Sequence, residues 1–180
     1  RFGRYLTSEE AKRPTPLVSF GFITDPKGGK VLARESKSIR AAIDRGRAIA
    51  AAVAHARDLV NEPAAVMTPT QLGIEASEIA KRHPQISVTV LSAKKCEELG
   101  MGMFLAVGKG SEQEPKLVHM IYKPTKRPKK KVALIGKGVT FDSGGYSLKP
   151  SNAMEDMKVD MSGAAAVISA MEALALLGSD

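Results

Sequence analysis

Apolar residues recur with two different periods along the chain, and the change of period separates predicted strands from predicted helices. Residues 86–92, ISVTVLS, alternate between apolar and polar positions and are rich in β-branched side chains, which predicts a strand. The apolar runs at residues 116–124, KLVHMIYKP, and 131–138, KVALIGKG, predict two more strands. A further candidate is residues 17–23, LVSFGFI, just before the turn-forming sequence DPKGGK.

Helical segments flank and separate these strands. They cover residues 39–60, 68–83, 93–100 and 162–178. Ser38 can cap the first of them, and Pro63 disfavours its continuation. Thr68 as a cap followed by Pro69 in the first turn is a typical helix opening. The last segment is apolar nearly all round, which indicates burial.

The alternation of strands and helices predicts an α/β fold with a mostly parallel sheet flanked by helices. We interpret residues 1–37 as the tail of an upstream α/β domain, residues 38–61 as a connecting helix, and residues 62–180 as part of the main domain. The last predicted helix closes at Gly178, where the alternation would continue with another strand. We therefore expect the sequence to belong to a longer protein.

Composition favours a soluble cytoplasmic protein. The chain is 43% hydrophobic and 26% charged, which is ordinary for a globular domain. No segment reaches the roughly 18 apolar residues that a membrane span requires, and the N-terminus lacks the apolar core of a secretory signal. The lone Cys96 excludes an internal disulfide and fits a reducing compartment. We interpret it as a buried thiol rather than a reactive one.

The net charge of +8 has a local origin in residues 123–131, KPTKRPKKK, which carry no acidic side chain. Such a run, with its two prolines, is typical of a solvated loop. It could also bind phosphate groups, but no aromatic residues interleave it for base stacking. The sequence therefore does not favour nucleic acid as a partner.

Residues 131–150, KVALIGKGVTFDSGGYSLKP, place charged side chains and glycines where a strand is expected to end. Lys137 and Asp142 would lie at the carboxyl end of that strand, and Asp160 just before the last helix would point to the same edge. Carboxylates that converge repel each other unless a cation shares the site, and hard oxygen ligands suit magnesium, manganese or zinc. A nearby dication could lower the pKa of Lys137 enough to make it a neutral donor, while Lys149 would stay charged and could stabilise an oxyanion. The alternative is that these four residues form surface ion pairs.

Phosphate-binding loops explain the glycines less well. GKGVTF has the first two glycines of a dinucleotide fingerprint, but Phe141 occupies the third position. GMFLAVGKG resembles a Walker loop, but Gly110 stands where a serine or threonine would bind magnesium.

The long motif at residues 132–150, followed by MEDMKVDMSGAAAV at residues 154–167, closely resembles the signature region of the leucyl aminopeptidases, the cytosol aminopeptidase family of dinuclear metallopeptidases. The likeness extends upstream through ARDLVNEPAAVMTP and covers roughly Arg45 to the C-terminus. The resemblance identifies residues 62–180 as part of a catalytic domain. Ser162 departs from the family's usual glycine.

The resemblance assigns a role to each matching position. Lys137 is similar to the amine ligand of the tighter metal site, Asp142 to the carboxylate that bridges both metals, and Asp160 to a further ligand of the tight site near the substrate's α-amine. Lys149 matches the catalytic lysine that polarises the scissile carbonyl and also contacts the substrate. Met157 matches a methionine that lines the pocket for the first side chain, although ordinary core packing would equally explain it.

The family likeness implies an aminopeptidase that releases leucine-type residues from peptides with free N-termini. The attacking water would be held by two divalent ions. These would be Mn²⁺ or Zn²⁺, with Mg²⁺ as a further candidate. It also implies a homohexamer. The family's second metal motif, similar to NTDAEGR, is absent from these 180 residues. We therefore expect the chain alone to be inactive. The alternative function is a non-catalytic module that binds DNA or peptides on the same fold.

Overall fold

The computed structural model describes residues 33–128 and 130–178. The chain divides into two compact units, Arg1–Arg47 and Ala48–Asp180. The strand predicted at residues 17–23 lies outside the described residues, and the domain boundaries drawn from the sequence stay predictions.

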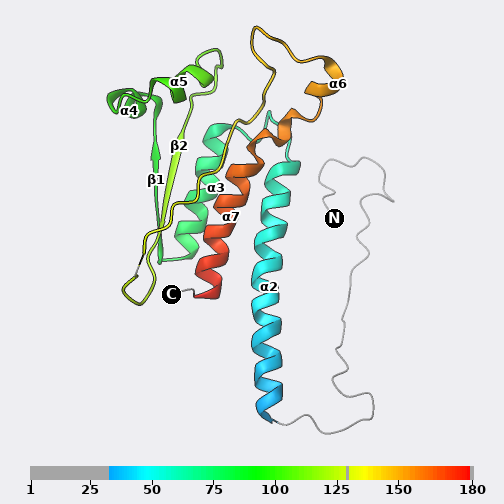
Figure 1. Ribbon diagram of the computed structural model, residues 1–180, viewed down its shortest axis with the longest axis vertical. Helices are drawn as coiled ribbons and strands as arrows, with labels where there is room; N and C mark the ends of the chain where they lie inside the picture. Colours follow the sequence, from blue (N-terminus) through cyan, green and yellow to red (C-terminus); the bar gives the residue numbers. More distant parts are fainter. Residues whose placement is uncertain (1–32, 129, 179–180) are drawn as a thin grey trace. The chain divides into compact units, whose positions relative to one another are not determined.

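Four of the described helices, α2, α3, α4 and α7, follow the sequence pattern, whereas α5, α6 and η1 were not predicted. Their bounds are α2 Ala33–Asn61, α3 Pro69–Arg82, α4 Ala93–Glu98, α5 Gly102–Gly108, α6 Ser151–Met154, the 3₁₀ helix η1 Met157–Met161, and α7 Ser162–Leu177 (Figure 1). The predicted cap of α3 is confirmed, because the hydroxyl of Thr68 accepts a hydrogen bond of 3.2 Å from the amide of Gln71. Gly178 ends α7 in the left-handed conformation with φ of 60°. Helix α2 begins earlier than the predicted cap at Ser38.

The mixed α/β class is confirmed, but the mostly parallel sheet is not found in the described residues. Strands β1, Ile86–Leu91, and β2, Leu117–Tyr122, form a two-stranded antiparallel sheet. Ile86 pairs with Tyr122 at one end of the ladder, and Leu91 pairs with Leu117 at the other. The short helices α4 and α5 connect the two strands, so the chain returns beside β1 in the opposite direction (Figure 1).

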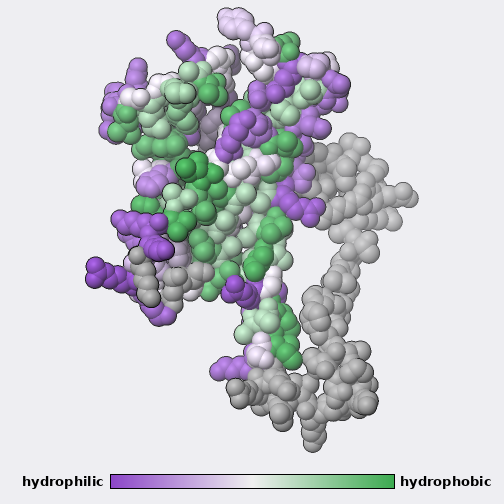
Figure 2. Space-filling view, viewed as in Figure 1, coloured by the Kyte–Doolittle hydropathy of each residue, from purple (hydrophilic) through white to green (hydrophobic). Residues whose placement is uncertain are grey.

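The strand predicted at residues 131–138 is wrong for this structure. Residues 130–138 form no strand and pair with neither β1 nor β2, although each of these strands has one free edge in the two-stranded sheet. The apolar side chains of this segment are exposed, Val132 at 82% and Ile135 at 94%. Figure 2 shows that apolar side chains gather on the face of the second unit that carries this segment.

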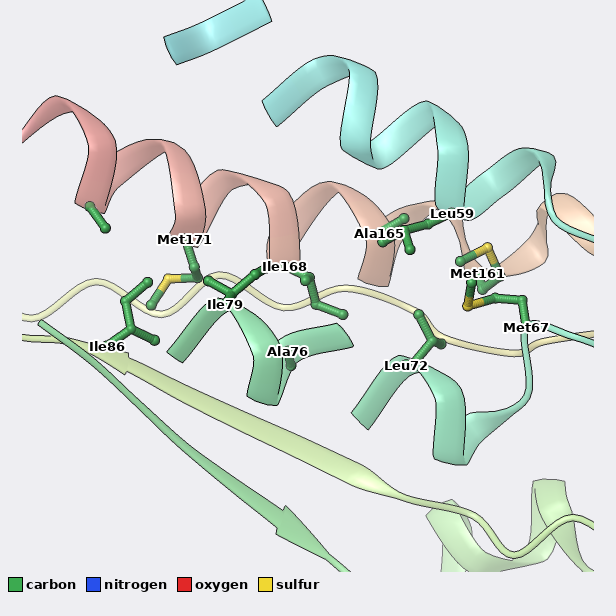
Figure 3. Close-up of a cluster of buried hydrophobic side chains, with 11 residues drawn as sticks. Leu59, Met67, Leu72, Ala76, Ile79, Ile86, Met161, Ala165, Ile168 and Met171 are labelled. Atoms are coloured by element: carbon green, nitrogen blue, oxygen red, sulfur yellow. The ribbon is translucent and has the colours of Figure 1, made fainter. Parts of the chain in front are cut away.

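The core of the second unit lies where α3, α7 and the sheet meet. It consists of Leu59, Met67, Leu72, Ala76, Ile79, Ile86, Met161, Ala165, Ile168, Met171 and Ala175 (Figure 3). Helix α7 buries four of these at a spacing of three to four residues, as a helix with one inward face must. Cys96 is also fully buried and free, as the sequence analysis predicted.

One stretch of the described residues, Ser151–Leu177, is long and apolar enough to cross a membrane by length and composition alone. The sequence analysis expected no such stretch. The difference arises because α6, η1 and α7 follow one another and add to the length. The core contacts of α7 account for the apolar residues on its inward face.

Candidate metal centre

The segment that carries Lys137 crosses the beginning of α7 at a distance that only glycine permits. A Cβ atom on Gly136 would lie 2.3 Å from the carbonyl oxygen of Gly163 and 2.8 Å from the Cα atom of Ala164. The amide of Ala164 donates a hydrogen bond of 2.8 Å to the carbonyl of Lys137. Because the obstructing atoms belong to the backbone, they have little room to move aside. The crossing brings Lys137 to the junction of η1 and α7, beside Asp160.

Lys137 and Asp160 form an ion pair across this crossing. The ammonium group donates a hydrogen bond of 2.8 Å to Oδ1 of Asp160 and lies 2.7 Å from Oδ2. The lysine side chain is 59% exposed, whereas that of the aspartate is only 19% exposed. Oδ2 of Asp160 is buried and receives no hydrogen bond from the described residues. A buried carboxylate oxygen without a donor is costly, unless another ligand reaches it.

The carboxylates raise the pKa of Lys137 above its ordinary value. The hydrogen bond to Asp160 is the main cause, desolvation opposes it, and the charges of Asp160 and Asp142 add to it. The sequence analysis expected a nearby dication to lower this pKa. In the structure described here Lys137 is therefore an ammonium group, and it would have to lose its proton before it could offer a lone pair to a metal.

The turn after residue 140 holds the second pair of charged side chains. The amide of Gly144 donates a hydrogen bond of 2.9 Å to Oδ1 of Asp142, and Gly144 has a φ of 90°, which favours glycine. The amide of Lys149 donates to the carbonyl of Ser143 at 2.9 Å and closes the turn. Nζ of Lys149 then lies 3.4 Å from Oδ2 of Asp142.

The four predicted residues belong to one electrostatic cluster. The pKa of Asp142 lies below its ordinary value, first because of the Gly144 hydrogen bond, against some desolvation, and then because of the positive charges of Lys149 and Lys137. The charges of Lys137 and Asp142 thus act on each other although each has its own partner. The surface ion pairs that the sequence analysis kept as an alternative are present, and they draw the predicted ligands together.

One feature of the donor set, the buried oxygen of Asp160, fits a divalent ion. The buried Oδ2 of Asp160 accepts no hydrogen bond of suitable geometry from the described residues, and the ammonium group of Lys137 lies 2.7 Å from it, in the place that a divalent cation would take. Two carboxylates and an amine are hard donors of the kind that Mn²⁺, Zn²⁺ or Mg²⁺ accept. Within residues 33–128 and 130–178, no group of three or more histidine, cysteine, aspartate or glutamate side chains is arranged to hold a metal ion. The lysine amine is therefore an essential part of the proposed donor set.

Met157 is the first residue of η1 and is half-buried. A large apolar groove of about 1150 Å³ lies between β2, the segment before Gly136 and α7, but Met157 does not line it. None of the four charged residues of the cluster lines this groove either. The predicted role of Met157 in a substrate pocket stays a prediction.

Comparison with known proteins places this geometry in a family. The catalytic-domain model of the cytosol aminopeptidase family matches residues 54–180. The chain belongs to the cytosol aminopeptidase family. The matched range contains the whole charged cluster and all of the core residues described above.

Curated members of the cytosol aminopeptidase family are close in sequence. A probable cytosol aminopeptidase of Chlorobaculum tepidum is 52% identical over 173 residues, which covers 96% of this chain and 33% of the relative. A probable cytosol aminopeptidase of Aquifex aeolicus is 46% identical over 135 residues, which covers 75% of this chain and 27% of the relative. The chain thus spans about a third of the length of the curated relatives it matches.

A solved structure supports the same assignment to the cytosol aminopeptidase family. The bottromycin maturation enzyme BotP, determined in complex with Mn, is similar with a TM-score of 0.67 and 39% sequence identity. The match covers 82% of this chain and 31% of that chain. This likeness extends the agreement from sequence to fold.

The sequence analysis did not consider Lys158, which lies two residues before Asp160. Nζ of Lys158 donates a hydrogen bond of 2.9 Å to the carbonyl oxygen of Asn61, the last residue of α2. The only signal in the sequence was a basic residue close to a predicted ligand, Asp160. That signal could not show which helix end it would reach.

Proposed function

We propose that this family member is a metal-dependent aminopeptidase that releases N-terminal residues, leucine among them, from peptides. The observation that carries the proposal is the contact between two predicted ligands: the amine of Lys137 lies 2.7 Å from the buried Oδ2 of Asp160, which accepts no hydrogen bond of suitable geometry from the described residues. The relatives named cytosol aminopeptidase and the Mn-bound structural relative support it.

The side chains of the cluster would be ligands of different metal ions. Lys137 and Asp160 would hold one divalent ion, and Asp142 would contribute to both ions of a complete site. The ions, when bound, would act as Lewis acids and lower the pKa of a water molecule so that it attacks the peptide carbonyl. Lys137 would release its proton as the ion binds, so metal affinity should rise with pH. Mn²⁺ or Zn²⁺ would serve, and Mg²⁺ is a further candidate.

Lys149 would act on the substrate. Its ammonium group now lies 3.4 Å from Oδ2 of Asp142, so it is held at the cluster and directed by the backbone hydrogen bond to Ser143. A fixed positive charge at this place would hydrogen-bond to the scissile carbonyl and stabilise the negative charge that develops on its oxygen. Asp160, as a ligand of the tighter metal site, would also help to bind the substrate's free α-amine, which would explain a preference for N-terminal residues.

The 180 residues alone would not catalyse the reaction. Three metal donors, Lys137, Asp142 and Asp160, are too few for two ions, since each ion normally takes four or more ligands. We propose that the complete protein works in the cytoplasm, as the names of its relatives suggest, and forms homohexamers. Peptides with free N-termini would be its substrates.

The proposal is tested by metal titration of the chain with a matched pair of variants. Unmodified chain should bind Mn²⁺, as measured by the loss of the free-ion electron paramagnetic resonance signal. Asp160→Asn should abolish this binding, because it removes the negative charge of the carboxylate beside Lys137 and replaces one of its oxygens with an NH₂ group. Asp156→Asn, an exposed aspartate just before η1, is the control and should bind as the unmodified chain does.

Two results would overturn the proposal. One is an unmodified chain that binds no Mn²⁺, and the other is an Asp160→Asn variant that binds it unchanged. In the complete protein, Lys149→Ala should lower turnover sharply while leaving the metal content intact. Loss of metal in that variant would instead assign a ligand role to Lys149.

A further inference from the structure

We infer that Lys158 is a positioning residue that fixes the carboxylate of Asp160 for the metal by anchoring η1 to the end of α2. The inference rests on the proposed function, because it concerns how the same site is held. Its direct observation is the hydrogen bond of 2.9 Å between Nζ of Lys158 and the carbonyl oxygen of Asn61, which bridges 97 residues of chain.

The bond joins groups that attract each other strongly. Asn61 is the last residue of α2, and the carbonyl groups at a helix end carry a partial negative charge and lack partners within the helix. An ammonium group is the appropriate donor for such a carbonyl. The lysine side chain is half-buried, so solvent screens the interaction only in part.

Beside the ion pair of Asp160 with Lys137, three contacts tie the short segment around Asp160 to other elements. Lys158 anchors it on one side, and the fully buried Met161 anchors it in the core beside Leu59 of α2 and Met67 (Figure 3). The amide of Ala164 then ties the start of α7 to the crossing segment. Of these three contacts, only that of Lys158 depends on a single hydrogen bond from a side chain.

Asp160 depends on this anchoring because of the geometry of a 3₁₀ helix. With three residues per turn, side chains two positions apart point in directions about 120° apart around the axis. Lys158 can therefore reach α2 while Asp160 faces Lys137. A rotation of η1 that follows the loss of the lysine contact would turn the carboxylate away from the amine. Supporting residues that orient ligands typically change metal affinity by about 10-fold to 100-fold.

The experiment compares Mn²⁺ affinity with thermal stability in four variants of the full chain. Lys158→Met keeps the length of the side chain but removes the donor, and should weaken Mn²⁺ binding about tenfold. Lys158→Arg restores a charged donor and should recover most of the affinity. Lys94→Met, at an exposed lysine on α4, controls for the added apolar surface. Ile79→Val, in the core of α3, controls for lowered stability and should bind Mn²⁺ normally.

The outcomes separate the inference from the proposed function. If the unmodified chain binds Mn²⁺ and Lys158→Met binds it equally well, the inference is overturned and the proposed function stands. Equal weakening in Ile79→Val would also overturn it, because the effect would then follow stability rather than position. If the unmodified chain binds no Mn²⁺, the proposed function is overturned, and the inference with it.

Discussion

Two acidic side chains in the second unit, Glu172 on α7 and Asp160 on η1, are similarly enclosed but differ in their hydrogen-bond partners. Glu172 is 13% exposed, and both of its oxygens have partners: Arg82 donates to Oε1 at 2.7 Å, and Nδ1 of His55 lies 3.0 Å from Oε2. Asp160 is similarly enclosed, but one of its oxygens receives no hydrogen bond from the described residues. A carboxylate whose oxygens both accept hydrogen bonds stabilises the fold, whereas one whose buried oxygen is contacted only by an exposed lysine among the described residues is suited to a ligand that replaces the lysine proton.

The partners of Glu172 come from separate helices, so this cluster ties the second unit together. His55 lies on α2, Arg82 lies on α3, and His83 follows α3 with its Nε2 atom 3.7 Å from Oε1. Nε2 of His55 also lies 3.6 Å from a carboxylate oxygen of Glu75 on α3. The pairs of the candidate site instead tie a turn and an extended segment to the start of one helix. The first cluster therefore serves packing, and we propose that the second serves binding.

The largest loss of stability is expected from a substitution at Gly136, where the segment of Lys137 crosses the start of α7. Gly136→Ala should destabilise the fold by about 3 kcal/mol, because the new methyl group would overlap the carbonyl oxygen of Gly163. Urea unfolding measures the change. Gly110→Ala is the control, since nothing lies within 4 Å of its Cβ position, and it should change stability by less than about 0.5 kcal/mol. Equal stability of the two variants would show that the crossing is not as close as described.

The second test removes the carboxylate of Glu172, both of whose oxygens have partners. Glu172→Gln should cost about 2 kcal/mol at neutral pH, because Arg82 and His55 lose a charged acceptor in a mostly enclosed place. Urea unfolding again gives the value. Glu78→Gln breaks an exposed pair with Lys81 and should cost about 0.3 kcal/mol. If the two substitutions had similar costs, the Glu172 cluster would not be a stabilising one.

The same cluster predicts how stability depends on pH. Burial alone would raise the pKa of Glu172, but the Arg82 hydrogen bond and the charges of His55 and Arg82 outweigh it, so the pKa is lowered. A lowered pKa means that the carboxylate stabilises the fold above its unfolded-state pKa of about 4.3, and that this contribution is lost as the pH falls through the folded-state pKa. The stability difference between the unmodified chain and Glu172→Gln should therefore shrink below about pH 4. Urea titrations at several pH values measure it, and a difference that grows in acid would refute the assignment.

How far the sequence predicts this molecule depends on the range of the interaction. Local signals succeeded, as in the cap at Thr68 and the left-handed Gly178, because they depend on neighbours in sequence. The predictions of strand direction and strand pairing were wrong. The apolar pattern of residues 131–138 indicates an extended chain, but it does not specify which strand pairs with it. The parallel sheet was inferred from alternation alone, whereas the connection through α4 and α5 returns the chain antiparallel.

The candidate site shows the same division. A long motif with unusual residue types was enough to name four candidate residues, Lys137, Asp142, Lys149 and Asp160. Their pairing could not, because it depends on the crossing of two distant backbones at Gly136. Glu172 appeared in the sequence only as an interruption of an apolar helix, since its partners lie 90 and 117 residues away.

The smallest effect on stability is expected where the effect on binding is largest. Asp160→Asn should change the free energy of unfolding by less than about 1 kcal/mol, because it loses an ion pair to a lysine that is 59% exposed and also removes a poorly partnered buried charge. Urea unfolding without added metal measures this, beside Glu172→Gln as the reference. A loss for Asp160→Asn as large as that for Glu172→Gln would mean that both carboxylates serve the fold. Near-neutral stability would mean that Asp160 is dispensable for folding, which is the property expected of a side chain retained for what it binds.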